Sequence, residues 1–135
     1  MKTCVFCSVV KKNKPYHEII FEDKKHLVFL DAHPLRKGHV LVIPKKHVDY
    51  LFSLREKDYL SLFALARKIA LTLKLAFRCK RVAVFVEGFS VPHTHIHLVP
   101  LQAELAIGGC TRKVSPKQSA DVAKTLRKHL SSRAR

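Results

Sequence analysis

The chain has 135 residues, with 26 Lys or Arg against 10 Asp or Glu, so its formal net charge is +16. Apolar residues make up 47% of it, a composition that excludes a disordered chain and favours one packed domain over residues 1–135. The charge favours an anionic partner, but it does not choose among nucleotides, nucleic acid and an anionic membrane.

The sequence predicts neither export nor membrane insertion. Its first ten residues are too short and too polar for the apolar core of a signal peptide, and the most apolar region, residues 59–77, is interrupted by three basic residues. We therefore expect a cytoplasmic protein without a membrane span. In that setting the Cys4-x-x-Cys7 pair indicates metal ligands or a redox pair rather than a structural disulfide.

Four strands are predicted ahead of the histidine-rich segment. Residues 18–22 and 26–31 form two of them, joined by a tight connection. Residues 39–43 form a continuous, β-branched run, which is typical of a strand buried on both faces. Residues 81–87 are rich in valine and form the fourth.

Two helices are predicted, each from a capping-box motif. Ser53 and Glu56 have the spacing in which both side chains satisfy free backbone N–H groups, so a long helix is expected to begin at Ser53. Ser115 and Gln118 repeat the pattern with a proline at the first helical position, which predicts a basic C-terminal helix over about 116–130. The first helix is expected to bury a stripe of Tyr59, Phe63, Ala66, Ala70, Leu73 and Phe77, and the second Val122, Ala123, Leu126 and Leu130.

Residues 92–100 contain three histidines at alternate positions, and a fifth strand is predicted there. A strand would place His93, His95 and His97 on one face, and the residues between them on the other. A single strand histidine often has no chemical role, but three on one face are difficult to explain by packing. Imidazole suits proton transfer, nucleophilic attack or metal binding near neutral pH.

These elements predict an α+β fold. We expect about five strands in an antiparallel sheet, one long helix between the third and fourth strands, and a helix at the C-terminal end.

The alternating histidines, followed by Leu98-Val99-Pro100, resemble the signature of the histidine triad (HIT) family of nucleotide hydrolases and transferases. Other segments between residues 4 and 101 follow the order and rough spacing of that family. They are Cys4-Val5-Phe6-Cys7, Ile20-Phe21-Glu22-Asp23, Phe29-Leu30-Asp31, the run from Gly38 to His47, and Glu87-Gly88. The Cys-x-x-Cys pair and the short segment before the histidines resemble a bacterial-type subgroup.

The resemblance implies a role for each histidine of the motif. His95 would attack the α-phosphate of a nucleotide and form a covalent nucleotidyl-histidine, which water then resolves. His97 would hold the phosphate and the leaving atom. His39 matches a histidine that could orient the nucleophile, with an ordinary strand residue as the alternative. The attack itself requires no cofactor.

The resemblance also implies a site for a purine nucleoside phosphate. Asp31 would bind the ribose hydroxyls, and Ser90 would donate to a phosphate oxygen. Phe89 and Val86 replace a glutamine and an asparagine of related sequences, which leaves the preferred leaving group open. The residues that match the walls of the base pocket, with ordinary core as the alternative, are Val5, Phe6, Val9 and Phe29.

A structural zinc site is implied by the same family. Cys4, Cys7, His47 and His93 match its four ligands, and two thiolates with two imidazoles satisfy tetrahedral zinc without an open position. The alternative is a reduced, metal-free cysteine pair.

The predicted function is hydrolysis of a nucleoside phosphoramidate or related nucleotide to the nucleoside monophosphate. One alternative is a dinucleoside polyphosphate hydrolase, and another is a basic module that binds nucleotide or nucleic acid without turnover. A homodimer is expected through the long helix, including Tyr59 and Phe63, and a sheet edge. Nucleic-acid binding by the basic C-terminal helix is the less favoured partner prediction.

Overall fold

The computed structural model describes residues 4–13, 17–105 and 114–133. One antiparallel sheet has the strand order β1-β2-β3-β5-β4. The strands are β1 (Ile19–Glu22), β2 (His26–Leu30), β3 (Val40–Pro44), β4 (Arg81–Phe85) and β5 (Ile96–Leu101). The helices are α1 (Val5–Val10), α2 (Glu56–Phe77) and α3 (Pro116–Arg133), with a 3₁₀ turn at Leu51–Ser53. The predicted α+β fold, with its long helix between the third and fourth strands, is confirmed.

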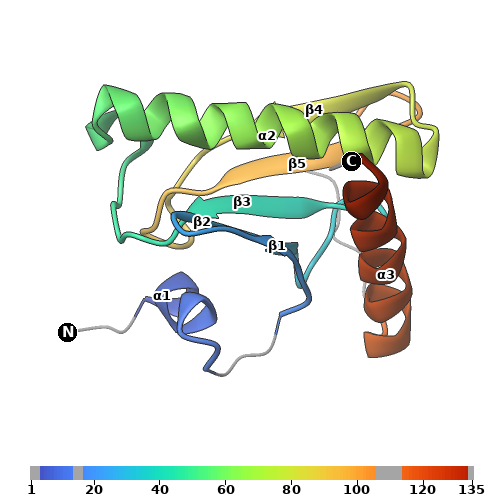
Figure 1. Ribbon diagram of the computed structural model, residues 1–135, viewed down its shortest axis with the longest axis horizontal. Coiled ribbons are helices and arrows are strands. Elements are labelled where there is room, and N and C mark those ends of the chain that lie inside the picture. Colours follow the sequence, from blue (N-terminus) through green and yellow to red (C-terminus); the bar gives the residue numbers. More distant parts are fainter. Residues whose placement is uncertain (1–3, 14–16, 106–113, 134–135) are drawn as a thin grey trace.

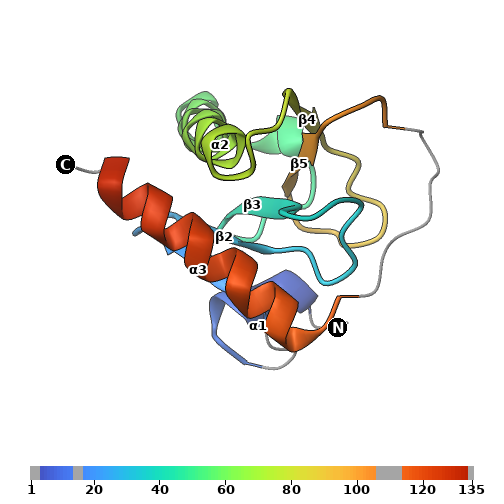
Figure 2. The ribbon, with the colours of Figure 1, turned by 90° about the vertical axis from the view of Figure 1, so that its right-hand side faces the viewer.

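Helices cover both faces of the sheet, because the central strands carry apolar side chains on both faces. Figure 1 shows α2 along one face and the short α1 beneath the other, and Figure 2 shows α3 crossing beside α2. Val28 and Val42 belong to the core formed with α2 and α3. Phe29 and Leu41 belong to a second core, which they form with Phe6 of α1. The third strand is buried along its whole length, as predicted.

The C-terminal helix forms as predicted and is attached to the sheet edge. The Ser115 hydroxyl accepts the Gln118 N–H at 3.1 Å, and the Gln118 side chain accepts the Ser115 N–H at 2.9 Å. The four apolar residues expected to face the core are buried. The Arg127 guanidinium donates to the Ile19 carbonyl and pairs with Glu18 at 3.0 Å, so this basic side chain joins α3 to β1.

The prediction for the start of α2 is wrong. The helix begins at Glu56 with Arg55 as its N-cap and without a side-chain cap, because Ser53 is already used in the preceding 3₁₀ turn. The buried face also differs from the predicted stripe, since α2 packs against both the sheet and α3. Of the predicted residues, Ala66 and Leu73 are buried, whereas Tyr59, Phe63, Ala70 and Phe77 are only partly buried. The fully packed face consists of Leu62, Leu65, Ala66, Ile69, Thr72 and Leu73.

The fifth strand begins later than predicted. It starts at Ile96 rather than near residue 92, because the preceding backbone is bonded to loops and not to a neighbouring strand. The His93 N–H donates to the Val91 carbonyl, and the Thr94 N–H donates to the Val48 carbonyl at 2.7 Å. Only His97 of the three histidines therefore lies in the strand.

The segment from Asp31 to His39 closes against the end of α2. Gly38 has a φ of +87°, and a Cβ at this position would lie 2.5 Å from the Phe77 ring. Glycine thus permits both the left-handed conformation and the close approach that place His39 at the start of β3. Separately, in the part of the chain that the structure describes, no helix has the length and apolar character needed to cross a bilayer.

Candidate active site and metal centre

A cavity of about 620 Å³ lies on the α1 side of the sheet, and the histidines that line it include His39, His95 and His97. We call it the histidine cavity. The register of β5 places His97 between Leu41 of β3 and Phe85 of β4, which point to the same face. The Phe85 ring stacks on the His97 imidazole at 4.3 Å with an interplanar angle of 10°. Strand pairing therefore sets the position of His97, and ring stacking its orientation.

His95 is held by main-chain and aromatic contacts. Its Nδ1 lies 2.6 Å from the His93 carbonyl oxygen, which can only accept, so Nδ1 carries the proton. The Nε2 atom of the neutral ring then has a free lone pair. The centroids of the Phe6 ring and the His95 imidazole lie 4.9 Å apart, and the two rings pack edge to face. The side chain is 3% exposed but lines the histidine cavity, an arrangement that suits a nucleophile.

A chain of hydrogen bonds defines the tautomers of His39 and His97. The Leu35 N–H donates to His39 Nδ1 at 3.0 Å, so neutral His39 carries its proton on Nε2. That atom lies 2.9 Å from His97 Nδ1, which must accept. Neutral His97 therefore carries its proton on Nε2. His39 thus orients His97, and its role in orienting His95 stays a prediction.

Burial keeps these imidazoles neutral. It lowers the pKa of His97 from 6.5 to about 4, with a further contribution from the neighbouring His95 and His39. Burial also lowers the pKa of His39, although the charge of Asp31 opposes the shift. In the free protein near neutral pH, His97 is therefore a neutral hydrogen-bond donor.

Asp31 lies beside the histidine pair. Its Oδ1 accepts the His33 N–H at 2.7 Å, and its Oδ2 lies 3.4 Å from His39 Nε2 and 3.9 Å from His97 Nδ1. The three groups are close enough to suggest a metal site. However, His39 Nε2 is protonated while Nδ1 accepts from Leu35, and a protonated nitrogen has no lone pair for a metal. We therefore interpret the trio as a hydrogen-bonded network.

A second cluster fits a metal ion better. The Sγ atoms of Cys4 and Cys7 and the Nδ1 atoms of His47 and His93 all lie within 4.8 Å of one another, and three of these contacts measure 3.3 to 3.5 Å. We call it the thiol–imidazole cluster. Tetrahedral zinc, with bonds of about 2.3 Å to sulfur and 2.0 Å to nitrogen, separates its ligand atoms by about 3.3 to 3.8 Å.

The protonation of the thiol–imidazole cluster also suits a cation. His93 Nε2 donates to the Pro44 carbonyl at 2.8 Å, so its Nδ1 lone pair faces the two thiols. Burial raises the pKa of the Cys7 thiol, and the neighbouring Cys4 raises it further. A divalent cation would offset the repulsion between the ionised Cys4 and Cys7 thiols. The four residues predicted from sequence could therefore bind a metal together.

The predicted substrate-binding residues separate into two groups. Val5, Phe6, Asp31 and Ser90 line the histidine cavity. Val9 and Phe29 are buried behind it, where the Phe29 ring meets Phe6 at 5.3 Å. The Ser90 hydroxyl is bonded to Glu87 at 3.3 Å.

Three site contacts are missing from the sequence analysis. The Leu35 amide and the Phe85 ring both act on the histidines, but neither belongs to a motif that identifies such a contact. The sequence motifs include Glu87 only beside Gly88, yet this exposed residue lines the histidine cavity. Its place two residues beyond β4, opposite the histidine strand, is the signal that could have identified it.

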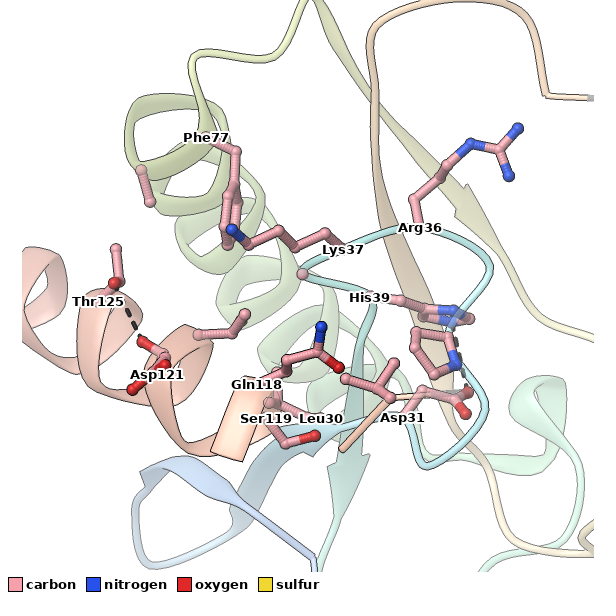
Figure 3. Close-up of a pocket in the computed structure, with 15 residues that line it drawn as sticks. Leu30, Asp31, Arg36, Lys37, His39, Phe77, Gln118, Ser119, Asp121 and Thr125 are labelled. Atoms are coloured by element: carbon pink, nitrogen blue, oxygen red, sulfur yellow. Dashed lines mark hydrogen bonds and ion pairs between the residues drawn. The ribbon is translucent and has the colours of Figure 1, made fainter. Parts of the chain in front are cut away.

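A second cavity, of about 350 Å³, lies beyond Asp31 and His39. Figure 3 shows it between the end of α2, the first turns of α3 and the loop that carries Arg36 and Lys37. We call it the helix cavity. Asp31 and His39 line both cavities, so they form a shared wall.

Comparison with known proteins gives concordant matches. The family model for the HIT domain matches residues 12–104. An uncharacterized HIT-like protein of Mycoplasma genitalium is 35% identical over 103 residues, which are 73% of this chain and 72% of that protein. The adenosine 5'-monophosphoramidase HINT3 of Danio rerio is 33% identical over 113 residues, 77% of this chain and 68% of its own. A zinc-bound histidine triad family protein from Mycobacterium smegmatis has a TM-score of 0.81 at 25% identity, with 98% of this chain and 96% of that chain covered.

Proposed function

Because the chain belongs to the HIT domain family, we propose that it is a nucleotide hydrolase in which His95 attacks the α-phosphate of a nucleoside phosphoramidate or related nucleotide. The observation that carries the proposal is the hydrogen bond from His95 Nδ1 to the His93 carbonyl, which leaves the Nε2 lone pair available for attack. Two relatives bear the name adenosine 5'-monophosphoramidase, which supports an amine as the leaving group.

The proposed reaction has two displacements. His95 Nε2 first forms a bond to phosphorus as the P–N bond breaks, and the leaving nitrogen takes a proton from protonated His97. Water then attacks the nucleotidyl-histidine, gives a proton to His97, and restores neutral His95. The bound phosphate must raise the pKa of His97 for the first proton transfer, since that pKa is about 4 in the free protein.

Asp31 and the α1 residues would hold the nucleoside. The Asp31 carboxylate suits the ribose hydroxyls, and the Val5 and Phe6 side chains offer an apolar wall for the base. Since these side chains form no hydrogen bond to the edge of a base, selectivity for purines is expected to be loose. A dinucleoside polyphosphate would fit the same nucleoside site and remains the second candidate substrate.

A trapping experiment tests the covalent route. The protein is incubated with adenosine 5'-phosphoramidate, quenched in denaturant and weighed by mass spectrometry. We expect an added adenylyl mass that is absent in His95→Ala and present in His129→Ala, because His129 lies on α3 outside the histidine cavity. An adduct that persists in His95→Ala, or absence of turnover and adduct with all candidate substrates, would contradict the proposal and favour the binding-only alternative.

We also propose that the thiol–imidazole cluster holds a structural zinc ion. When bound, zinc would tie α1 to the segment that precedes the histidine strand. The Phe6 side chain on α1 touches the His95 ring, so the cluster would also support one wall of the histidine cavity. The arrangement of ligand atoms and the His93 lone pair support this proposal.

Metal content and stability test the zinc proposal. Purified protein and the Cys79→Ser control should retain zinc, because Cys79 is buried away from the cluster, whereas Cys7→Ser should lose most of it. The free energy of unfolding should fall by about 4 kcal/mol in Cys7→Ser when free zinc is about a thousandfold above its dissociation constant. Equal zinc content in all three proteins would refute the assignment.

For the whole molecule we propose a single domain that forms a homodimer in the cytoplasm. Leu60 and Leu75 on α2 and Val84 on β4 are exposed apolar residues on the helix and sheet edge expected to pair. Nucleic-acid binding by α3 stays the less favoured alternative, since Arg127 is already engaged with β1.

A further inference from the structure

The histidine cavity is acidic although the chain is strongly basic. The net charge is +16, yet the described residues that line this cavity include Asp31 and Glu87 and neither lysine nor arginine. The nearby Arg36 and Lys37 line the helix cavity instead, on the other side of the shared wall. An anionic leaving group would therefore meet a carboxylate in the histidine cavity, without a lysine or arginine to neutralise it.

Glu87 is fixed by the turn that follows β4. One carboxylate oxygen accepts the N–H groups of Phe89 and Ser90 at 3.2 Å each and the Ser90 hydroxyl at 3.3 Å. These hydrogen bonds lower the pKa of Glu87, so the carboxylate is ionised near neutral pH. The same bonds occupy donors that could otherwise contact a phosphate.

The sheet places the two acidic residues on opposite sides of the histidine strand. Asp31 follows β2, Glu87 follows β4, and β5 lies between these strands in the sheet order. If Asp31 holds the ribose, as proposed above, the part of the histidine cavity beside Glu87 is left for the leaving group.

We propose that Glu87 selects substrates by the charge of the leaving group, favouring nucleoside phosphoramidates whose amine portion carries an additional positive charge. The inference rests on the proposed function and names its substrate class. When the P–N bond breaks, its electron pair stays on nitrogen, which gains a proton and departs as an amine. A second cationic group on that amine is attracted to the Glu87 carboxylate, whereas a carboxylate or polyphosphate there is repelled.

A charge series of leaving groups tests the inference. Adenosine 5'-phosphoramidates of 1,4-diaminobutane, butylamine and 4-aminobutyrate have similar length but carry a positive, neutral or negative end. The kcat/KM of each substrate is measured with the unaltered protein, with Glu87→Gln and with Glu104→Gln. Glutamine keeps the oxygen that accepts the turn hydrogen bonds, and Glu104 is an exposed carboxylate outside the histidine cavity.

The ratio of cationic to anionic substrate separates charge selection from damage to the turn, because damage lowers both rates. We expect a ratio of roughly three to ten in the unaltered protein and in Glu104→Gln, falling toward one in Glu87→Gln, as one screened charge at about 6 Å would produce. A ratio near one in the unaltered protein, or an unchanged ratio in Glu87→Gln, would overturn the inference while leaving the proposed function intact. Absence of turnover and of adenylated His95 with all three substrates would instead refute the proposed function.

Discussion

Main-chain groups give the site histidines their separate properties. The Pro44 carbonyl directs the lone pair of His93 toward the two thiols, and the His93 carbonyl directs that of His95 outward. The Leu35 N–H instead donates to His39 Nδ1, so the proton of this neutral ring lies on Nε2. In the neutral rings, His93 and His39 therefore carry the proton on Nε2, whereas His95 carries it on Nδ1.

The low pKa of His97 predicts that stability depends on pH. Between about 4 and 6.5 the unfolded chain binds a proton at this residue and the folded chain does not, so the free energy of unfolding falls as pH falls through this window. The full effect is about 3 kcal/mol. Between about pH 7.5 and pH 4.5, the free energy of unfolding should fall by about 2 kcal/mol less in His97→Gln than in the unaltered protein. Urea unfolding at the two pH values measures this difference.

An exposed histidine provides the control for this prediction. His33→Gln changes the same residue type on the surface and should keep the pH dependence of the unaltered protein. Loss of the proposed zinc ion at low pH would affect all three proteins alike, so the difference among them isolates His97. Equal pH dependence in His97→Gln would show that the imidazole is protonated in the folded protein.

The residue types of the site could be predicted from sequence, but their contacts could not. Alternation and family motifs predicted roles for His95, His97 and the four residues of the thiol–imidazole cluster, and the structure brings them together in two places. His39 was expected near the nucleophile, whereas its Nε2 contacts His97, because that geometry depends on an amide four residues earlier in a folded loop. The acidic character of the histidine cavity was equally inaccessible, since a net charge of +16 says nothing about which basic side chains turn away from it.

At the scale of elements, two similar sequence motifs have different outcomes. Ser115 forms the reciprocal hydrogen bonds of a capping box at α3, whereas Ser53 lies in a 3₁₀ turn and caps nothing at α2. The local pattern is present in both, but a preceding turn shifted the start of α2 by three residues. The fifth strand also started late, because the Val48 carbonyl accepts the Thr94 N–H ahead of it.

A pair of matched substitutions tests this difference. Ser115→Ala should lower the free energy of unfolding by about 1 kcal/mol, because it removes a side-chain cap. Ser53→Ala should change it by less than about 0.5 kcal/mol, since no cap is lost. Chemical denaturation of the two variants measures both values. Equal costs would show that the Ser115 cap adds nothing to stability or that Ser53 contributes by another contact.

At the scale of the whole molecule, the two edges of the sheet differ. Arg127 of α3 donates to the Ile19 carbonyl and protects the β1 edge, whereas Val84 on the β4 edge is 53% exposed. An exposed apolar edge strand favours pairing with another chain. The β4 edge, together with the exposed leucines of α2, is therefore the surface we expect to form the proposed dimer.

Charge on that edge should prevent association. Val84→Lys introduces a charge at an exposed position, so the fold should persist while sedimentation velocity shows a shift from dimer to monomer. Lys124→Glu, an exposed change on α3, should remain dimeric. A dimeric Val84→Lys protein, or a monomeric unaltered protein, would contradict the proposed interface.

The group that accepts the hydrogen bond from His95 Nδ1 belongs to the main chain of His93, and this affects how the sequence can diverge. Every amino acid at position 93 presents the same carbonyl, so no substitution there deletes the group that orients the nucleophile. The side chain at position 93 can therefore change, and the thiols at positions 4 and 7 with it, while the acceptor remains. The proposed metal centre uses the side chain of His93, whereas the proposed nucleophile uses its carbonyl, so a lineage can lose the first and retain the second.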